Sequence, residues 1–251
     1  MSARPDGRYS DRLVFLHGFT QTHHHWHRVA LALGDRSGRA TTLAFVDLPG
    51  HGLSTHDRTG IAPAAIAAAG LGGAGTYIGY SMGGRVALLA ALARPDLVER
   101  LVLIGATAGI DDEHDRATRR ASDDDRATRV EHVGVGRFLD EWLAAEMFAD
   151  LPADHDGLAH RQRNTAAGLA HSLRTGGTGR QPSVWGRLHE IEVPALVLAG
   201  ANDTKFVDLG ERLAEGLPHA DFVTIADAGH AAHVESPRAT VDVIAGWLAD
   251  G

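Results

Sequence analysis

One serine of the sequence lies in the spacing G-x-S-x-G, within Gly79-Tyr80-Ser81-Met82-Gly83. An apolar run at Thr76–Ile78 precedes the motif and a helical pattern follows it, which is the strand–turn–helix context that a nucleophile turn requires. The glycines permit a strained turn that lifts the serine Oγ clear of a sheet, and the N-terminus of the following helix favours negative charge there. We therefore predict that Ser81 is catalytic, as a nucleophile or as a base.

A serine of this kind needs a histidine base and an acid that orients the base, in the chain order Ser, Asp or Glu, His. Asp203 follows the apolar run Ala195–Ala199, and His230 follows the run Phe222–Ile225. Both residues therefore lie at the carboxyl ends of predicted strands, as Ser81 does. We predict a triad of Ser81, Asp203 and His230.

Each member of the triad has an alternative. The competing acid is Asp227, but its closeness to His230 in sequence makes a side-on hydrogen bond awkward. The competing base is His233, which we expect to cover a loop instead. Without these partners, the motif around Ser81 is an ordinary glycine-rich turn.

Two backbone N–H groups are predicted to bind the oxyanion. His17-Gly18-Phe19 ends the first apolar run, and in such loops the third residue donates opposite the residue that follows the nucleophile. The donors are therefore Phe19 and Met82. The turn Asp47–Gly52 follows the second apolar run; we interpret Asp47 as scaffold and leave the role of His51 open.

These residues need a sheet that brings them to one edge. Short apolar runs, each typical of a buried strand, alternate with helical stretches, so we predict a parallel sheet covered on both faces. The runs are Leu13–Leu16, Leu43–Val46, Thr76–Gly79, Leu101–Ile104, Ala195–Ala199 and Phe222–Ile225, and the helices are Trp26–Leu33, Met82–Ala93, Phe206–Glu215 and Ser236–Ala249.

About ninety residues between the fourth and fifth strands carry helical patterns but no clear buried strand. We predict a helical cap at 108–185, inserted into a core of 1–107 and 186–251, over the strand ends where open α/β sheets bind ligands. Arg174–Gln181 is expected to be a flexible join. The acidic clusters 111–113 and 123–125 are expected to be solvated cap surface.

Composition excludes several classes. The chain has 251 residues, a net charge of −8 and no cysteine, which excludes disulfides and thiolate sites and disfavours nucleic-acid binding. Neither a signal peptide nor a membrane span is visible, so we expect a cytoplasmic protein, with a monomer favoured. The tract His23–His27 suggests a metal, but no carboxylate or cysteine is interleaved and the spacing suits an exposed helix start. We therefore expect no metal and no cofactor.

Five segments together resemble the 2-succinyl-6-hydroxy-2,4-cyclohexadiene-1-carboxylate synthases of menaquinone biosynthesis, a family within the α/β-hydrolase superfamily. They are VFLHGF (Val14–Phe19), VDLPGHG (Val46–Gly52), GYSMGGR (Gly79–Arg85), DTKF (Asp203–Phe206) and AGHAAHVESP (Ala228–Pro237). The resemblance implies the α/β-hydrolase fold with a helical cap. It also implies a lyase that eliminates pyruvate from 2-succinyl-5-enolpyruvyl-6-hydroxy-3-cyclohexene-1-carboxylate, a small substrate with three carboxylates.

The resemblance also implies which residues hold this anion. Arginine suits carboxylates because its planar fork binds both oxygens. The family's arginines correspond to Arg85, Arg119 and Arg163, its cap tryptophan to Trp142 and its tyrosine beside the nucleophile to Tyr80. In the cap, Arg120 lies next to Arg119 and Arg161 lies two residues before Arg163, so the family's arginines could instead correspond to these neighbours.

Two other functions stay open at this point. A carboxylesterase or a carbon–carbon bond hydrolase of a small metabolite uses the same triad, but an enzyme for neutral esters has no use for three cations. A non-catalytic ligand receptor on the same fold is the alternative of another class. It would retain the triad without rapid turnover.

Overall fold

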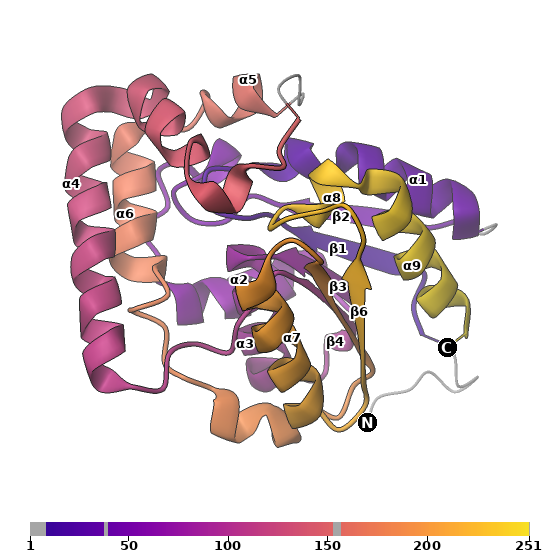
Figure 1. The fold of residues 1–251 in the computed structure, drawn as a ribbon. Coiled ribbons are helices and arrows are strands. Elements are labelled where there is room, and N and C mark those ends of the chain that lie inside the picture. The colour runs from indigo at the N-terminus through magenta and orange to yellow at the C-terminus, as the bar shows by residue number, and fades with distance from the viewer. Residues whose placement is uncertain (1–8, 38–39, 153–156, 251) are drawn as a thin grey trace.

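Six parallel strands form one sheet at the centre of the protein, in the order β2-β1-β3-β4-β5-β6 (Figure 1). The computed structural model describes residues 9–37, 40–152 and 157–250. The strands are β1 (Arg12–Leu16), β2 (Thr42–Val46), β3 (Gly75–Tyr80), β4 (Val98–Ile104), β5 (Ala195–Gly200) and β6 (Ala220–Ile225). All six predicted strands are present, and the predicted α/β-hydrolase fold class is confirmed.

Helices cover both faces of the sheet because successive side chains of each strand point to opposite sides. In β1, Phe15 packs on Trp26 with ring centroids 5.4 Å apart, whereas Val14 and Leu16 belong to the core on the other face. The first face is covered by α1 (His27–Ser37), α8 (Ala232–Glu235) and α9 (Pro237–Asp250), and the second by α2 (Ile61–Gly72), α3 (Met82–Ala93) and α7 (Thr204–Gly216). Short 3₁₀ helices are η1 (His23–Trp26), η2 (Gly52–Ser54), η3 (Glu146–Phe148) and η4 (Trp185–Glu190).

One core helix was not predicted. Helix α2 consists of alanine, glycine, isoleucine, leucine and one proline, so it lacks the polar residues that make a helical period visible. It packs against α3, and this contact decides its position.

The segment between β4 and β5 is helical, as expected. It contains α4 (Glu113–Leu143), α5 (Leu158–Arg161) and α6 (Ala166–Gly176). Helix α4 is interrupted at Gly134, where φ is 78° and ψ is 169°, and α4 and α6 lie side by side around a small apolar core of their own (Figure 1). The boundaries 108 and 185 of a separate cap stay a prediction.

The C-terminal part of the segment Arg174–Gln181, for which a flexible join is expected, packs against the core. Residues 176–179 and Gln181 are buried, and Gln181 has no exposed surface. The side chain of Arg85 donates hydrogen bonds to Gln181 Oε1 and to the carbonyl of Gly176, at 3.0 and 2.8 Å. The expectation of a flexible join is therefore wrong here, because a buried cation holds this segment against the core.

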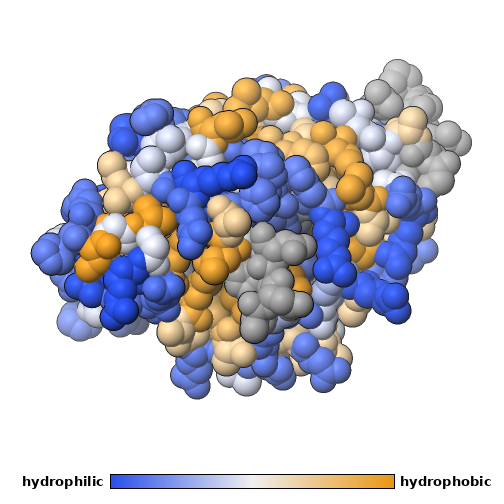
Figure 2. Space-filling model, turned by 90° about the horizontal axis from the view of Figure 1, so that it is seen from above, coloured by the Kyte–Doolittle hydropathy of each residue, from blue (hydrophilic) through white to orange (hydrophobic). Residues whose placement is uncertain are grey.

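The face of the molecule that is seen from above mixes residue types. Seen from above, hydrophilic and hydrophobic side chains are interspersed over the molecule (Figure 2). Among the described residues, no helix has the length and apolar character needed to cross a membrane.

The start of α3 lies unusually close to β1. A Cβ atom built on Gly83 would lie 2.0 Å from the carbonyl oxygen of Leu16, and one on Gly79 would lie 2.5 Å from the carbonyl oxygen of Gly83. No side chain fits in either gap. The two glycines of the motif therefore set the distance between helix and sheet.

We expect Gly83→Ala to lower the free energy of unfolding by about 1–3 kcal/mol or more, because backbone atoms must move apart. Gly246→Ala in α9 is the matched control, since in the part of the chain that the structure describes no atom outside its own stretch of helix lies within 4 Å of the added methyl group. That variant should gain about 0.5–1 kcal/mol from helix propensity. Urea unfolding measures both, and equal stability of the two variants would contradict the packing argument.

Candidate active site

Ser81 sits in a strained turn between β3 and α3. Its φ is 49° and its ψ is −107°, a conformation that non-glycine residues rarely adopt. The hydrogen bond from Ser81 N–H to the carbonyl of Ile104, at 2.8 Å, ties the turn to β4. The hydroxyl is thereby held above the carboxyl ends of the strands.

The structure brings the three predicted triad residues together. His230 Nε2 lies 3.1 Å from Ser81 Oγ, and His230 Nδ1 lies 2.7 Å from Asp203 Oδ2. Asp203 also caps α7 by accepting the N–H of Phe206. The Phe206 ring packs on the imidazole with centroids 4.4 Å apart, and only 2% of His230 is exposed. Asp203 therefore orients the imidazole of His230, and the ring of Phe206 packs against it.

The alternative acid Asp227 and the alternative base His233 lie outside the hydrogen-bonded arrangement of Ser81, His230 and Asp203. Asp227 is exposed, so it does not share the buried site of His230. His233 is buried between the rings of Trp26 and Tyr80, with centroids 4.6 and 4.4 Å away. It belongs to the core beneath the site, and in the described part of the chain it forms no hydrogen bond with Ser81.

Phe19 and Met82 line the same cavity as Ser81. The hydrogen bonds described for this part of the chain leave the N–H groups of both residues without an acceptor. The residue after Phe19 anchors the loop. Thr20 has a φ of 67°, and its N–H donates a hydrogen bond to His51 Nε2 at 3.2 Å. His51, whose role the sequence left open, is thus a scaffold for the predicted oxyanion loop.

Three buried histidines surround this loop in the neutral form. Burial lowers the pKa of His17 to about 4, and it lowers the pKa of His51 and of His233 to about 3. His17 Nε2 accepts the N–H of Leu48 at 3.0 Å, a role that needs an unprotonated nitrogen. The loops around the site therefore depend on uncharged imidazoles.

A cavity of about 470 Å³ opens above Ser81, between core and cap segments. Two arginines on its wall are buried: Arg85 is 6% exposed and Arg161 is 2% exposed. Burial lowers the pKa of Arg85 to about 9 and of Arg161 to about 10, so both are cations at neutral pH. Among the described residues, the hydrogen-bond partners of Arg85 and Arg161 are neutral groups and neither arginine pairs with a carboxylate. Arg161 Nε has no hydrogen-bond acceptor there.

Arg119 also lines the cavity, and an acidic residue positions it. Its Nε donates to Asp123 Oδ1 at 2.9 Å, four residues along α4, and Asp123 lies 3.4 Å from Arg126, another cavity residue. The Asp123 side chain is 1% exposed. The expectation that all of 123–125 is solvated is therefore wrong for Asp123, which faces inward to orient two cations.

The arginine of α5 at the cavity is Arg161, two residues before the expected Arg163. Arg163 is exposed and does not line the cavity, whereas Arg161 does. The reason is the short helix α5: Arg161 is its last residue and turns inward to hydrogen-bond Thr20 Oγ1. The same turn leaves Arg163 outside.

Tyr80 and Trp142 both line the cavity, as the resemblance implies. Burial raises the pKa of Tyr80, so its hydroxyl stays protonated. The indole N–H of Trp142 is buried and has no acceptor among the residues described. Its ring meets Phe19 edge-on with centroids 5.2 Å apart.

Sequence reasoning did not single out Arg126, Lys205 or Gln181 for the site. Arg126 sits seven residues after Arg119, two turns along the same helix face, which is the signal that could have found it. Lys205 directly follows the pair Asp203-Thr204 and lines the cavity. No sequence signal marks Gln181.

The chain matches the model of the alpha/beta hydrolase family over residues 13–243. It belongs to that family. This agrees with the sheet order, the strained serine and the order of the triad residues along the chain.

Individual relatives are more specific. The chain is 33% identical to 2-succinyl-6-hydroxy-2,4-cyclohexadiene-1-carboxylate synthase of Escherichia coli O1:K1 / APEC, over 93% of this chain and 92% of that protein. It is 35% identical to a Bacillus subtilis protein provisionally named as the same synthase, over 68% of this chain and 64% of that protein. The structure of MenH from S. aureus superposes with a TM-score of 0.83 and 31% identity, covering 97% of this chain and 95% of that one. The resemblance that the motifs indicate is confirmed.

We expect a fluorophosphonate probe to label Ser81. His230→Ala and Asp203→Asn should slow labelling by about 10³-fold or more, because the hydroxyl loses its base or the base loses its orientation. Intact-mass spectrometry follows the reaction. Asp227→Asn and Ser172→Ala, a second cavity serine, are the matched controls and should label at the parental rate. Labelling of Ser81→Ala would show that another residue is the nucleophile.

Acid should destabilise the protein through its buried histidines. The folded pKa values of His17, His51 and His233 lie below the ordinary value, so between about pH 6.5 and pH 4 the unfolded chain binds protons that the folded chain does not. Stability is then lost as pH falls, by up to about 1.4 kcal/mol per pH unit for each histidine.

Urea unfolding across this pH window measures the slope. His233→Gln should reduce the slope by about one histidine's share. His114→Ala, at an exposed position of α4, should leave it unchanged. An identical slope in parent and His233→Gln would contradict the assignment.

Proposed function

We propose that this protein is a lyase that eliminates pyruvate from 2-succinyl-5-enolpyruvyl-6-hydroxy-3-cyclohexene-1-carboxylate, giving 2-succinyl-6-hydroxy-2,4-cyclohexadiene-1-carboxylate. One observation carries the proposal: two buried arginines without carboxylate partners share a cavity with a strained, histidine-bound serine. A buried cation is costly unless an anion compensates it. The site is therefore incomplete without an anionic ligand.

The triad supplies the base for this elimination. His230 takes the proton of Ser81, and Ser81 Oγ removes the ring proton next to the succinyl ketone. The electron pair of that C–H bond moves toward the ketone oxygen, where the N–H groups of Phe19 and Met82 stabilise the enolate. Each donor of this kind contributes roughly 3–4 kcal/mol in comparable sites. The enolate then re-forms the ketone. A double bond forms between C2 and C3 of the ring, the existing C3–C4 double bond shifts to C4–C5, and the bond from C5 to the enolpyruvyl oxygen breaks.

The leaving group departs as the enolate of pyruvate. Ser81 retains the ring proton, and the proton that His230 took from Ser81 passes to the enolate to give pyruvate, so the triad returns to its starting state. No water is consumed. The triad supplies the base and the two N–H donors stabilise the enolate, so we expect the reaction to need no cofactor. The same triad could also perform acyl transfer with Ser81 as nucleophile.

We assign the three substrate carboxylates to Arg85, Arg119 and Arg161, with Arg161 in place of Arg163. Tyr80 and Trp142 complete the wall, where a phenol and an unpaired indole N–H offer donors to the substrate. The net charge of −8 gives no general attraction for polyanions, so this local cluster of cations accounts for the selection of a small anion. We propose a cytoplasmic monomer that binds no nucleic acid.

Substituting the buried arginines separates this lyase from an esterase. Arg85→Ala and Arg161→Ala should each lower kcat/KM for pyruvate release by about ten- to a hundred-fold or more, because a charge-assisted contact contributes roughly 1.5–3 kcal/mol. Lysine should rescue each site only in part, since a point charge lacks the planar fork. Arg163→Ala is the matched control and should retain the parental rate.

Hydrolysis of p-nitrophenyl acetate by the same variants reports on the fold and the triad. It should barely change, because this ester has no carboxylate to hold. Brisk ester hydrolysis with undetectable pyruvate release in the parent protein would contradict the lyase and favour a carboxylesterase. Neither activity, in a protein that still binds an anion, would favour the receptor.

A further inference from the structure

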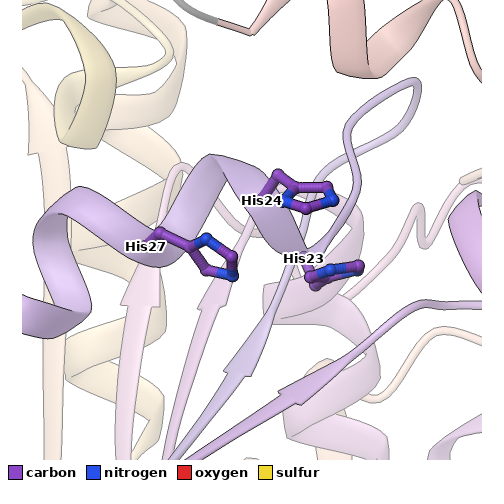
Figure 3. Close-up of side chains that lie close together, drawn as sticks. All are labelled: His23, His24 and His27. Carbon is purple, nitrogen blue, oxygen red and sulfur yellow. The ribbon is translucent and has the colours of Figure 1, made fainter.

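Three histidines from the tract His23–His27 converge outside the active site. They lie where η1 passes into α1, with their rings side by side (Figure 3). One ligand nitrogen each from His23, His24 and His27 can be chosen so that all three lie within 4.8 Å of one another. The ring centroids are 4.0 Å apart for His23 and His24, and 5.5 and 5.0 Å from these two to His27.

A carboxylate from another element orients one of the three rings. His23 Nδ1 lies 2.7 Å from Asp47 Oδ2, and His23 N–H donates to Asp47 Oδ1 at 2.7 Å. Asp47 is largely buried; its side chain is 3% exposed. When Nδ1 donates its proton to this carboxylate, Nε2 of His23 is left with a free lone pair. Metal-binding histidines are held by carboxylates in this way, which fixes their tautomer and increases their basicity.

We propose that His23, His24 and His27 form a binding site for one divalent transition-metal ion, with Asp47 as the carboxylate that orients His23. Three imidazoles without a direct oxygen ligand suit Zn²⁺ and its neighbours, whereas Mg²⁺ and Ca²⁺ prefer oxygen. Three histidines also leave a fourth position on Zn²⁺ for water or another ligand.

The rings need only a small adjustment to bind the ion. With Zn–N distances of about 2.0–2.1 Å in a tetrahedron, the ligand nitrogens lie about 3.3 Å apart. Since the nitrogens of the three rings lie within 4.8 Å of one another, an approach of about 1.5 Å closes the widest gap. His27 is exposed and His23 and His24 are half-buried, so their side chains have room to rotate.

The cavity beside the rings has the space and the neighbours for such a site. It measures about 430 Å³ and is lined by His24 and His27. From the cap, the ring of His160 stacks on His24 with centroids 4.0 Å apart. Arg161 lines this cavity as well as the active-site cavity, so the ion would lie behind the wall that we assign to substrate binding, outside the triad.

Zinc binding to the full-length protein tests the site without any substrate. After treatment with a chelator and its removal, titration calorimetry with Zn²⁺ should show one site per chain, and Mg²⁺ should give no signal. His23→Ala, His24→Ala and His27→Ala should each raise the Kd for Zn²⁺ at least about tenfold. Asp47→Asn should raise it by about ten- to a hundred-fold, as for other orienting carboxylates.

His114→Ala, an exposed histidine on α4, is the matched control and should bind Zn²⁺ as the parent does. Co²⁺ in place of Zn²⁺ should give the intense visible bands of a four-coordinate site, and these should vanish in His27→Ala. Thermal unfolding without metal shows which variants fold. Because His27 is exposed, we expect His27→Ala to fold, so its Zn²⁺ binding tests the site even where Asp47→Asn or His23→Ala is unstable. Absent binding in the parent, or binding that survives all three histidine substitutions, would overturn the proposal.

Discussion

The contact between the first turn of α3 and the ends of β1 and β3 is the constraint on which the site depends. Hydrogen atoms in place of side chains at Gly79 and Gly83 let backbone approach backbone, and Ser81 between these glycines adopts a strained conformation with positive φ. The strained serine lies 3.1 Å from His230 Nε2, and Met82 at the start of the helix lines the same cavity. The position of the candidate catalytic serine and that of the predicted oxyanion donor at Met82 are thus set by the same packing contact.

Burial of charge is the second organising feature. Arg85 satisfies part of its hydrogen-bonding capacity through Gln181 and Gly176, which are neutral, and Arg161 does so through Thr20. Neutral acceptors keep the cations in place without cancelling their charge. A buried cation is costly unless an anion compensates it, and this cost is the reason for the anionic ligand that we propose for the cavity.

Neutral histidines connect these features. His17 and His51 accept backbone N–H groups around the Phe19 loop, and protonation would replace each acceptor by a donor. Asp47 lies 3.7 Å from His17 and 2.7 Å from His23, so one carboxylate links the scaffold of the oxyanion loop to the proposed metal site. The predicted oxyanion loop and the proposed metal site therefore share one supporting residue, Asp47, while their chemistry is separate.

The sequence by itself determined the sheet and the residues of the candidate triad. Apolar runs define parallel strands, and the carboxyl ends of parallel strands meet at one edge, so Ser81, Asp203 and His230 had to lie near one another. The sequence did not determine α2, which has no polar face, or the inward face of α5, whose single turn has no measurable period. Only the tertiary structure decided that Arg161 rather than Arg163 faces the cavity, that Asp123 is buried, and that Asp47 reaches His23 across 24 positions of the chain. These depend on contacts between elements distant in sequence, and local patterns carry no information about such contacts.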